Sequence, residues 1–301
     1  MPNTIAHFAV NGLISRALIS NADLKWIYLA CVIPDIPWIL QRILRSLPWA
    51  LDLYDIRAYC IAQSSFLVCI FLCLALSFLA KQRGKVFLIL ILGCVLHLLV
   101  DALQIKWANG VQMLAPFDWQ LFRFDLFWPE SMGTYLLTVA GLIYLIANIA
   151  KVIQPNCNEF VISLKSVGVA AIFGLIWLAL PIAFISSVYQ ADNHFIATLK
   201  DADNRADKPI EIDRNTLAHL ESGAALLTSF GEVLLVENIN ADDGDLISIQ
   251  GRFIGNDAVY VENYHVHSKF RDYASMFGLA CVLLIWLIFI SRCLLSNQQK
   301  V

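Results

Sequence analysis

Long apolar runs are the feature of this sequence that most restricts its fold. A helix that crosses a bilayer needs roughly 20 consecutive apolar residues, because its length must cover the hydrocarbon core. Hydrophobic residues make up 59% of the 301 residues, above the roughly 45–50% of soluble domains. We therefore predict an all-α polytopic membrane bundle. Its candidate segments are residues 5–19, 25–43, 60–80, 86–104, 132–150, 166–189 and 274–293.

The first segment leaves the number of crossings open. Residues 5–19 are amphipathic, which is typical of a helix that lies partly in the membrane interface. Seven crossings with the N-terminus outside is one solution, and six crossings plus an interfacial first helix is the other. In either case residues 1–189 form the transmembrane helical domain, and residues 274–301 form a last transmembrane helix with a tail.

Between these two parts, residues 190–273 change in character. The stretches "GEVLLVENI", "DLISIQGRFIG" and "DAVYVENYHVHS" alternate apolar and polar residues and are separated by Gly, Asp and Asn. This pattern is typical of short strands joined by turns. We predict a small inserted β-rich domain, with a small barrel of OB-like type as its form.

The distribution of Lys and Arg predicts the orientation. Cytoplasmic loops are enriched in these residues, and "KQRGK" at 81–85 is the densest short basic loop. Lys151, Lys165, Arg292 and Lys300 fall on the same side when the helices are counted from this loop. The β-rich domain is then extracytoplasmic. It is also acidic, because residues 190–272 contain 15 acidic and 7 basic residues. We expect a multi-pass protein of a bacterial inner membrane, with this domain in the periplasm.

Four ionisable residues interrupt the apolar segments at one predicted depth, near the outer face. They are His7, Asp35 in "CVIPDIPWIL", and the pair His97 and Asp101 in "GCVLHLLVDALQ". Ionisable groups inside a membrane are costly, and they usually pair and mark a functional site. His97 and Asp101, four residues apart, lie on one helix face. Imidazole and carboxylate groups are ligands of zinc and similar ions, so the four residues predict a metal site.

Each of these residues also has a structural interpretation. His97 and Asp101 could form a hydrogen-bonded contact between helices, and His7 could be an interfacial histidine near a terminus. Asp35 could cap a kink made by Pro34 and Pro37. The shared depth and matching chemistry of the four residues favour the metal site, in which the ion would lower the pKa of a bound water to near 7.

In order along the chain, "HFAVNGLISR", "PDIPW", "HLLVD" and "GVQMLAPF" resemble the motifs of the bacterial family of membrane-bound metal-dependent hydrolases. The resemblance covers about residues 1–150. It implies a metal site near the outer face, with His7, Asp35, His97 and Asp101 as ligands of a divalent ion, zinc in the first place. It also implies a hydrolase, without fixing the substrate.

The sequence departs from that family at one motif. Where the family has a histidine before a serine, this chain has "IAQSSF", with Gln63 before Ser64. Glutamine is a poor zinc ligand, so we assign Gln63 the role of orienting water. Arg57, six residues before Gln63 in the sequence, is suited to hold an anionic group such as a phosphate. The departure leaves open whether the site is catalytically active.

Two further histidines lie in the β-rich domain. His265 and His267 in "YHVHS" are two residues apart and share a strand face. Such a pair can bind metal, but with no third ligand nearby in the sequence we expect an exposed strand face.

We therefore predict a membrane-bound metal-dependent hydrolase that acts at the periplasmic face, on a lipid or a phosphoester. The alternative is a non-catalytic scaffold or pseudoenzyme whose β-rich domain binds a partner. The expected partners are membrane lipid and a periplasmic protein or glycan, and no nucleic acid.

Overall fold

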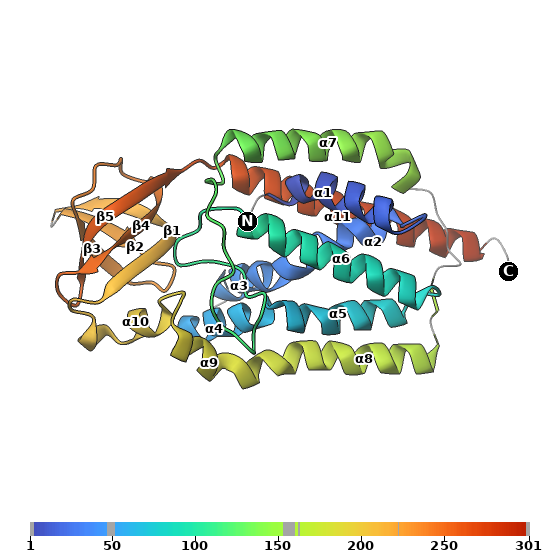
Figure 1. The fold of residues 1–301 in the computed structure, drawn as a ribbon, viewed down its shortest axis with the longest axis horizontal. Helices are drawn as coiled ribbons and strands as arrows, with labels where there is room; N and C mark the ends of the chain where they lie inside the picture. The colour runs from blue at the N-terminus through green and yellow to red at the C-terminus, as the bar shows by residue number, and fades with distance from the viewer. Residues whose placement is uncertain (1–2, 47–51, 153–159, 162, 222, 299–301) are drawn as a thin grey trace.

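The computed structural model describes residues 3–46, 52–152, 160–161, 163–221 and 223–298. Long helices lie side by side in one half of the elongated molecule, and all five strands form the other end (Figure 1). The loop between α6 and α7 runs along the boundary between these halves. The helices are α1 (Thr4–Leu18), α2 (Leu24–Ala30), η1 (Ile33–Asp35), α3 (Ile36–Ser46), α4 (Leu53–Gln63), α5 (Phe66–Phe78), α6 (Arg83–Ala102), α7 (Met132–Val152), α8 (Leu164–Ala179), η3 (Leu180–Phe184), α9 (Ile185–Ala191), α10 (Ile196–Lys200), η4 (Ala202–Asn204) and α11 (Phe270–Gln298).

Five of the described helical stretches are long and apolar enough to cross a membrane. Their outer faces carry large apolar side chains exposed to the surroundings, for example Leu136, Leu175 and Leu283. A surface of this kind suits lipid rather than water. The five stretches are Leu24–Ser46, Arg83–Ala102, Met132–Val152, Leu164–Ala191 and Phe270–Cys293.

The expected segment 60–80 is not one straight helix. Helices α4 and α5 meet at a bend of 70°, and together they make a sixth candidate span. The hydroxyls of Ser64 and Ser65 donate to the carbonyls of Ile61 and Ala62, at 2.9 and 2.8 Å. These side chains compete with the helical backbone for its acceptors, which favours a break at this point.

The first expected segment is not among the candidate spans. Helix α1 has 15 residues, too few for a bilayer, so the described helices give five candidate spans, or six when the bent pair counts as one. Helix α1 packs inside the bundle, very close to α7. A Cβ at Gly141 would overlap the backbone carbonyl of Ile5, so only glycine permits this approach. Buried His7 is held by this packing.

The prolines of "CVIPDIPW" break the second span as expected. Pro34 lies in η1 and Pro37 in the first turn of α3. The backbone N–H of Asp35 donates to Val32 rather than to Cys31. The Cys31 carbonyl is therefore free of the usual helical bond. Gly93 lets α6 approach α2 closely at this level, because a Cβ there would overlap the side chain of Ala30.

The strands form a separate five-stranded domain, residues 209–267, inside the region predicted to be β-rich. β2 and β4 both pair antiparallel with β1, β3 pairs with β2, and β5 pairs antiparallel with β4 and parallel with β3. Buried Ile, Leu, Val and Phe side chains fill the space between the strands. The strands are β1 (Pro209–Leu220), β2 (Gly223–Leu227), β3 (Val233–Glu237), β4 (Leu246–Phe253) and β5 (Ala258–His267).

Hydrogen bonds join the α6–α7 loop, residues 103–131, to the five-stranded domain. The backbone N–H of Ala108 donates to Glu211 Oε2 at 2.7 Å, and the side chain of Asn109 donates to Asp213 Oδ2 at 2.9 Å. Both acceptors lie on β1. The loop therefore connects the ends of the membrane helices to the sheet.

Candidate metal centre

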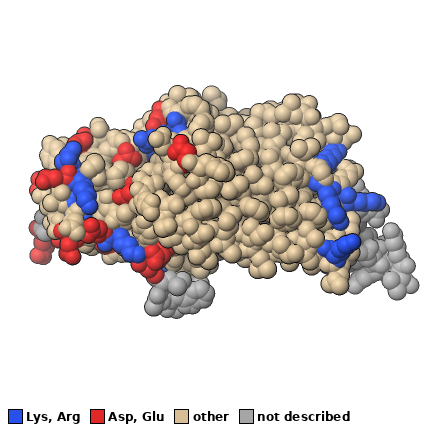
Figure 2. All heavy atoms as spheres, turned by 60° about the horizontal axis from the view of Figure 1, so that its bottom comes forward, with Lys and Arg blue, Asp and Glu red and all other residues tan. Residues whose placement is uncertain are grey.

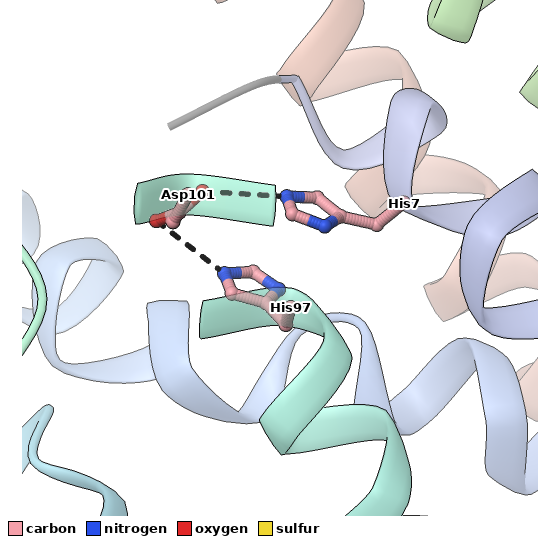
Figure 3. A group of neighbouring side chains, drawn as sticks. All are labelled: His7, His97 and Asp101. Carbon is pink, nitrogen blue, oxygen red and sulfur yellow. Dashed lines mark ion pairs between the residues drawn. The ribbon is translucent and has the colours of Figure 1, made fainter. Parts of the chain in front are cut away.

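The structure brings the four predicted ligand residues together. His7 comes from α1, Asp35 from η1, and His97 and Asp101 from successive turns of α6. His7 Nε2 lies 3.5 Å from Asp101 Oδ1, and His97 Nε2 lies 3.3 Å from Asp35 Oδ1 and 3.8 Å from Asp101 Oδ2. His7, His97 and Asp101 face one another from the two helices (Figure 3). Each of the three offers one ligand atom within 4.8 Å of the others.

The hydrogen bond on the far side of His97 determines which of its nitrogens carries the proton. Its Nδ1 lies 2.9 Å from the Cys31 carbonyl. A carbonyl only accepts, so Nδ1 donates, and Nε2 of the neutral ring carries a lone pair. That lone pair faces the carboxylates of Asp35 and Asp101, which are also acceptors. Among the described residues Nε2 has no hydrogen-bond partner.

His7 is equally short of partners. Its side chain is fully buried, and neither ring nitrogen has a hydrogen-bond partner in the described part of the chain. The ring stacks on that of His97, with centroids 3.9 Å apart and planes 4° from parallel. Buried polar atoms are nearly always paired, so an unpaired group suggests an unseen ion or water. Two parallel imidazoles next to two carboxylates are suited to a divalent transition metal.

Lys106 belongs to this cluster, although the sequence analysis did not select it. Its ammonium lies 3.2 Å from Asp101 Oδ2, and both side chains are less than a tenth exposed. Asp35, Asp101 and Lys106 together have a net charge of −1, which favours the binding of a further cation. The only signal in the sequence was a single lysine among apolar and aromatic residues shortly after the "HLLVD" motif.

A small cavity reaches the cluster from the loop side. Its volume is about 20 Å³, and Asp35, Asp101 and Lys106 line it together with Ser64 and Gln112. This is room for about one water molecule. Access to the carboxylates is therefore from the side of the α6–α7 loop and the five-stranded domain.

A larger, open cavity of about 430 Å³ lies farther out. The α6–α7 loop, the segment after α9 and β1 line it, through residues that include Trp119, Asn193 and Glu211. Its volume is in the range of small-molecule sites. Gln112, on the small cavity, donates to Asn193 at 3.4 Å, so this hydrogen bond lies between the two cavities.

Among the described residues, neither Arg57 nor Gln63 pairs with the four candidate ligands. Arg57 donates to Gln41 at 3.3 Å and lies over the Trp38 ring, 4.5 Å from its centroid. Gln63 donates to the hydroxyl of Tyr59 at 3.1 Å, and its carbonyl oxygen is buried with no partner in the described chain. Both are nevertheless close to the small cavity, because Trp38 and Ser64 line it.

His194 is a third buried histidine near this region. Its Nδ1 lies 2.8 Å from Asn193, and no described carboxylate forms an ion pair with it. Burial, followed by the positive charge of Arg57, lowers the pKa of His194 to about 3. His194 is therefore neutral at physiological pH.

A second group of ligand-type residues lies where β5 meets the α6–α7 loop. Glu130 of the loop contacts His265 Nε2 through Oε2 at 3.1 Å and His267 Nδ1 through Oε1 at 3.0 Å. The expectation of an exposed strand face was wrong, because the His267 side chain is only 1% exposed. The sequence did not indicate the third residue, since Glu130 is 135 positions before His265.

Comparison of the chain with protein-family models, with curated proteins and with solved structures finds no match.

Proposed function

We propose that the protein is a membrane-bound metal-dependent hydrolase, with His7, Asp35, His97 and Asp101 as the ligands of one zinc ion. The observation that carries the proposal is the His97 ring. Its proton is committed to the Cys31 carbonyl, so its buried Nε2 lone pair faces two carboxylates. A divalent cation turns this contact between acceptors into a favourable one. The resemblance of residues 1–150 to the membrane-bound hydrolases agrees with this proposal.

The residues around the ligands have separate roles in it. Cys31 orients His97 and increases its basicity, as partners behind a metal-bound histidine generally do. Lys106 holds Asp101 and offers a positive charge to an anionic substrate oxygen. Arg57 and Gln63 adjoin Trp38 and Ser64, which line the small cavity. In this proposal Arg57 holds an anionic group of the substrate and Gln63 orients water. A bound zinc ion supplies Lewis-acid chemistry, which activates water and polarises a carbonyl or phosphoryl oxygen.

The substrate we propose is a lipid or another amphiphile with an ester or phosphoester bond. The ligands lie at the end of helices that suit a bilayer, so a lipid headgroup can reach them from the membrane surface. The open cavity of about 430 Å³ offers room for a headgroup. Lys106, on the small cavity, offers a positive charge to an anionic one. The role of membrane lipid as partner is part of this proposal.

We propose an orientation with the five-stranded domain and the metal centre in the periplasm of a bacterial cell, the helices lying in the inner membrane. At the end of the bundle far from the strands the charged side chains in view are Lys and Arg, whereas the acidic side chains gather at the strand end, where Lys and Arg also occur (Figure 2). This separation follows the positive-inside rule. Cys293, at the basic end, is disulfide-bonded, which by itself favours an oxidising compartment. The many basic residues outweigh this one bond.

We also propose an OB-like small barrel for the five-stranded domain, with a periplasmic protein or glycan as its partner. The pairing supports it, since the order β1-β2-β3-β5-β4 returns to β1. We propose such a partner because the domain lies outside the candidate membrane spans.

Metal analysis of the detergent-purified protein tests the proposal. To keep other histidines out of the measurement, the protein should carry a tag without histidine. We expect zinc bound to the parent at this site to be lost in His97→Ala and in the isosteric Asp101→Asn. His219→Ala is the matched control, because His219 is exposed in the five-stranded domain. It should leave the zinc content unchanged.

A screen with phospholipids and phosphoesters then separates an enzyme from a pseudoenzyme. The hydrolase predicts release of product by the parent and not by Asp101→Asn. Bound zinc with no turnover would favour the scaffold alternative, to which Gln63 in place of the family histidine already points. If both variants fold and hold as much zinc as the parent, the metal site itself is wrong.

A further inference from the structure

The second ligand group, Glu130 with His265 and His267, is built by an irregularity in the sheet. Val261 of β5 lies opposite Gly251 of β4, but the pairing then shifts by one residue, so that His265 lies opposite Ser248. Residues opposite each other share a sheet face. The shift turns the odd-numbered positions of β5 away from the core. As in other β-bulges, it re-aims side chains, here toward the α6–α7 loop.

The hydrogen bonds around Ser248 determine the proton on His267. The Ser248 hydroxyl lies 3.1 Å from Asp213 Oδ1, and a carboxylate only accepts, so the hydroxyl donates there. It accepts from the backbone N–H of Arg214 at 3.0 Å. His267 Nε2, 2.8 Å from the same oxygen, must therefore donate. The neutral His267 ring then carries its lone pair on Nδ1.

That lone pair lies 3.0 Å from Glu130 Oε1. Two acceptors thus face each other, as they do around His97 in the bundle. His265 Nε2 approaches the other oxygen of the same carboxylate at 3.1 Å. One ligand atom from each of the three residues lies within 4.8 Å of the others. Separations of 3.0–3.1 Å are a few tenths of an ångström shorter than those between tetrahedral ligands with bonds of roughly 2.0–2.2 Å, so the side chains need to move apart only slightly to admit an ion.

The surroundings hold the three residues in place. The indole of Trp128 stacks on His265 with centroids 3.8 Å apart. Arg214 lies 3.3 Å from Glu130 and 2.9 Å from Asp272, so its charge is shared between two carboxylates. Behind His267, the path through Ser248 ends at a carboxylate. Metal-bound histidines usually have such a partner on the second nitrogen.

We propose that Glu130, His265 and His267 form a second metal site, which binds a divalent transition metal ion of the zinc type and fastens the α6–α7 loop to β5. This site is separate from the hydrolase centre and does not depend on it. Two imidazole nitrogens and one carboxylate are a ligand set of zinc. A single added proton would relieve only the contact between His267 and Glu130. A metal ion engages all three side chains at once.

Zinc titration of a chain without the first site tests this proposal. The variant H97A/D101N removes two ligands of the bundle site. In detergent, with a tag free of histidine, we expect it to bind one zinc ion, and the parent to bind two. Adding His267→Gln should abolish the remaining zinc, whereas the matched change His219→Gln in the same domain should not.

A milder variant covers the case in which His267→Gln does not fold. Ser248→Ala keeps all three ligands but releases the His267 ring, and we expect zinc affinity to fall roughly 10- to 100-fold. X-ray absorption at the zinc edge should show two imidazoles. A folded H97A/D101N protein that binds no zinc overturns the second site. If the parent binds zinc and loses it only in His267→Gln, the hydrolase centre is wrong and the second site is supported.

Discussion

The two ligand groups share one motif in very different surroundings. In each, an imidazole nitrogen is committed to a protein acceptor, the Cys31 carbonyl for His97 and Ser248 for His267, and the other nitrogen faces carboxylate oxygen. The bundle site is buried among apolar helices and reached by one small cavity, and several of its polar atoms have no partner in the described chain. At the strand site, arginine, serine and tryptophan side chains contact the ligands.

This difference has an energetic consequence. A buried charge without a partner is costly, whereas one that retains ion pairs is tolerated. The bundle site should therefore depend on its cation for stability, and the strand site should keep its shape without one. Chelation should lower the melting temperature mainly through the bundle site.

The largest effect is expected when Lys106 is replaced by methionine. Among the described Lys and Arg residues, Lys106 forms the ion pair with buried Asp101. In the presence of chelator, Lys106→Met leaves that carboxylate unpaired, and breaking a buried pair costs about 3–5 kcal/mol. With saturating zinc the loss should be much smaller, since the ion takes over the charge. Chemical unfolding with zinc and with chelator measures the difference.

Lys208→Met is the matched control, because this lysine is exposed and lies 3.9 Å from its partner Asp201. Its removal should change stability little in either condition. An equal loss of stability in Lys106→Met with and without zinc would contradict the idea that metal and lysine share one carboxylate.

A smaller effect is expected when α6 is pushed away from α2. Gly93→Val places atoms where Ala30 lies, and overpacking of this kind costs about 1–3 kcal/mol. The shift should also loosen the bond between His97 and Cys31. Because partners behind a ligand are worth roughly 10- to 100-fold in affinity, the bundle site should lose zinc affinity while the strand site keeps it.

Gly84→Val in the same helix is the control, since a Cβ there meets no other atom within 4 Å. Zinc titrations of both variants, analysed as two separate binding steps, measure whether only the bundle site loses affinity. Loss of both steps in Gly93→Val would show that the two sites are not independent.

The parts of these sites that the sequence predicts are those that depend on residues close together in the chain. His97 and Asp101 are one helical turn apart, and the prolines around Asp35 mark a break, so local spacing was enough to group them. The spans themselves followed from apolar length. The bend between α4 and α5 was missed because it depends on two serine hydroxyls bonding to the backbone.

The remaining parts depend on tertiary contacts. Lys106 reaches Asp101 only through the path of the loop, and the Cys31 carbonyl reaches His97 only because Gly93 lets two helices approach. The sequence of β5 suggested an exposed pair of histidines, since it carries no sign of the register shift opposite β4 or of Glu130 from a distant loop.

The smallest effect is expected from His194, a buried histidine that forms no ion pair with a described carboxylate, unlike His97 and His267. His194 has an unpartnered Nε2 in the described chain, but the pKa of His194 is lowered to about 3 by burial and by Arg57. The unfolded chain therefore binds a proton below its ordinary pKa of about 6.5 while the folded chain does not. Stability from this residue is complete above pH 6.5 and is lost as the pH falls toward 3. At pH 5 the loss amounts to about 2 kcal/mol.

His194→Asn, which cannot titrate, should show a shallower fall in melting temperature between pH 7 and 5, and His219→Asn should follow the parent. A parallel fall in all three proteins would mean that His194 takes up a proton in the folded state.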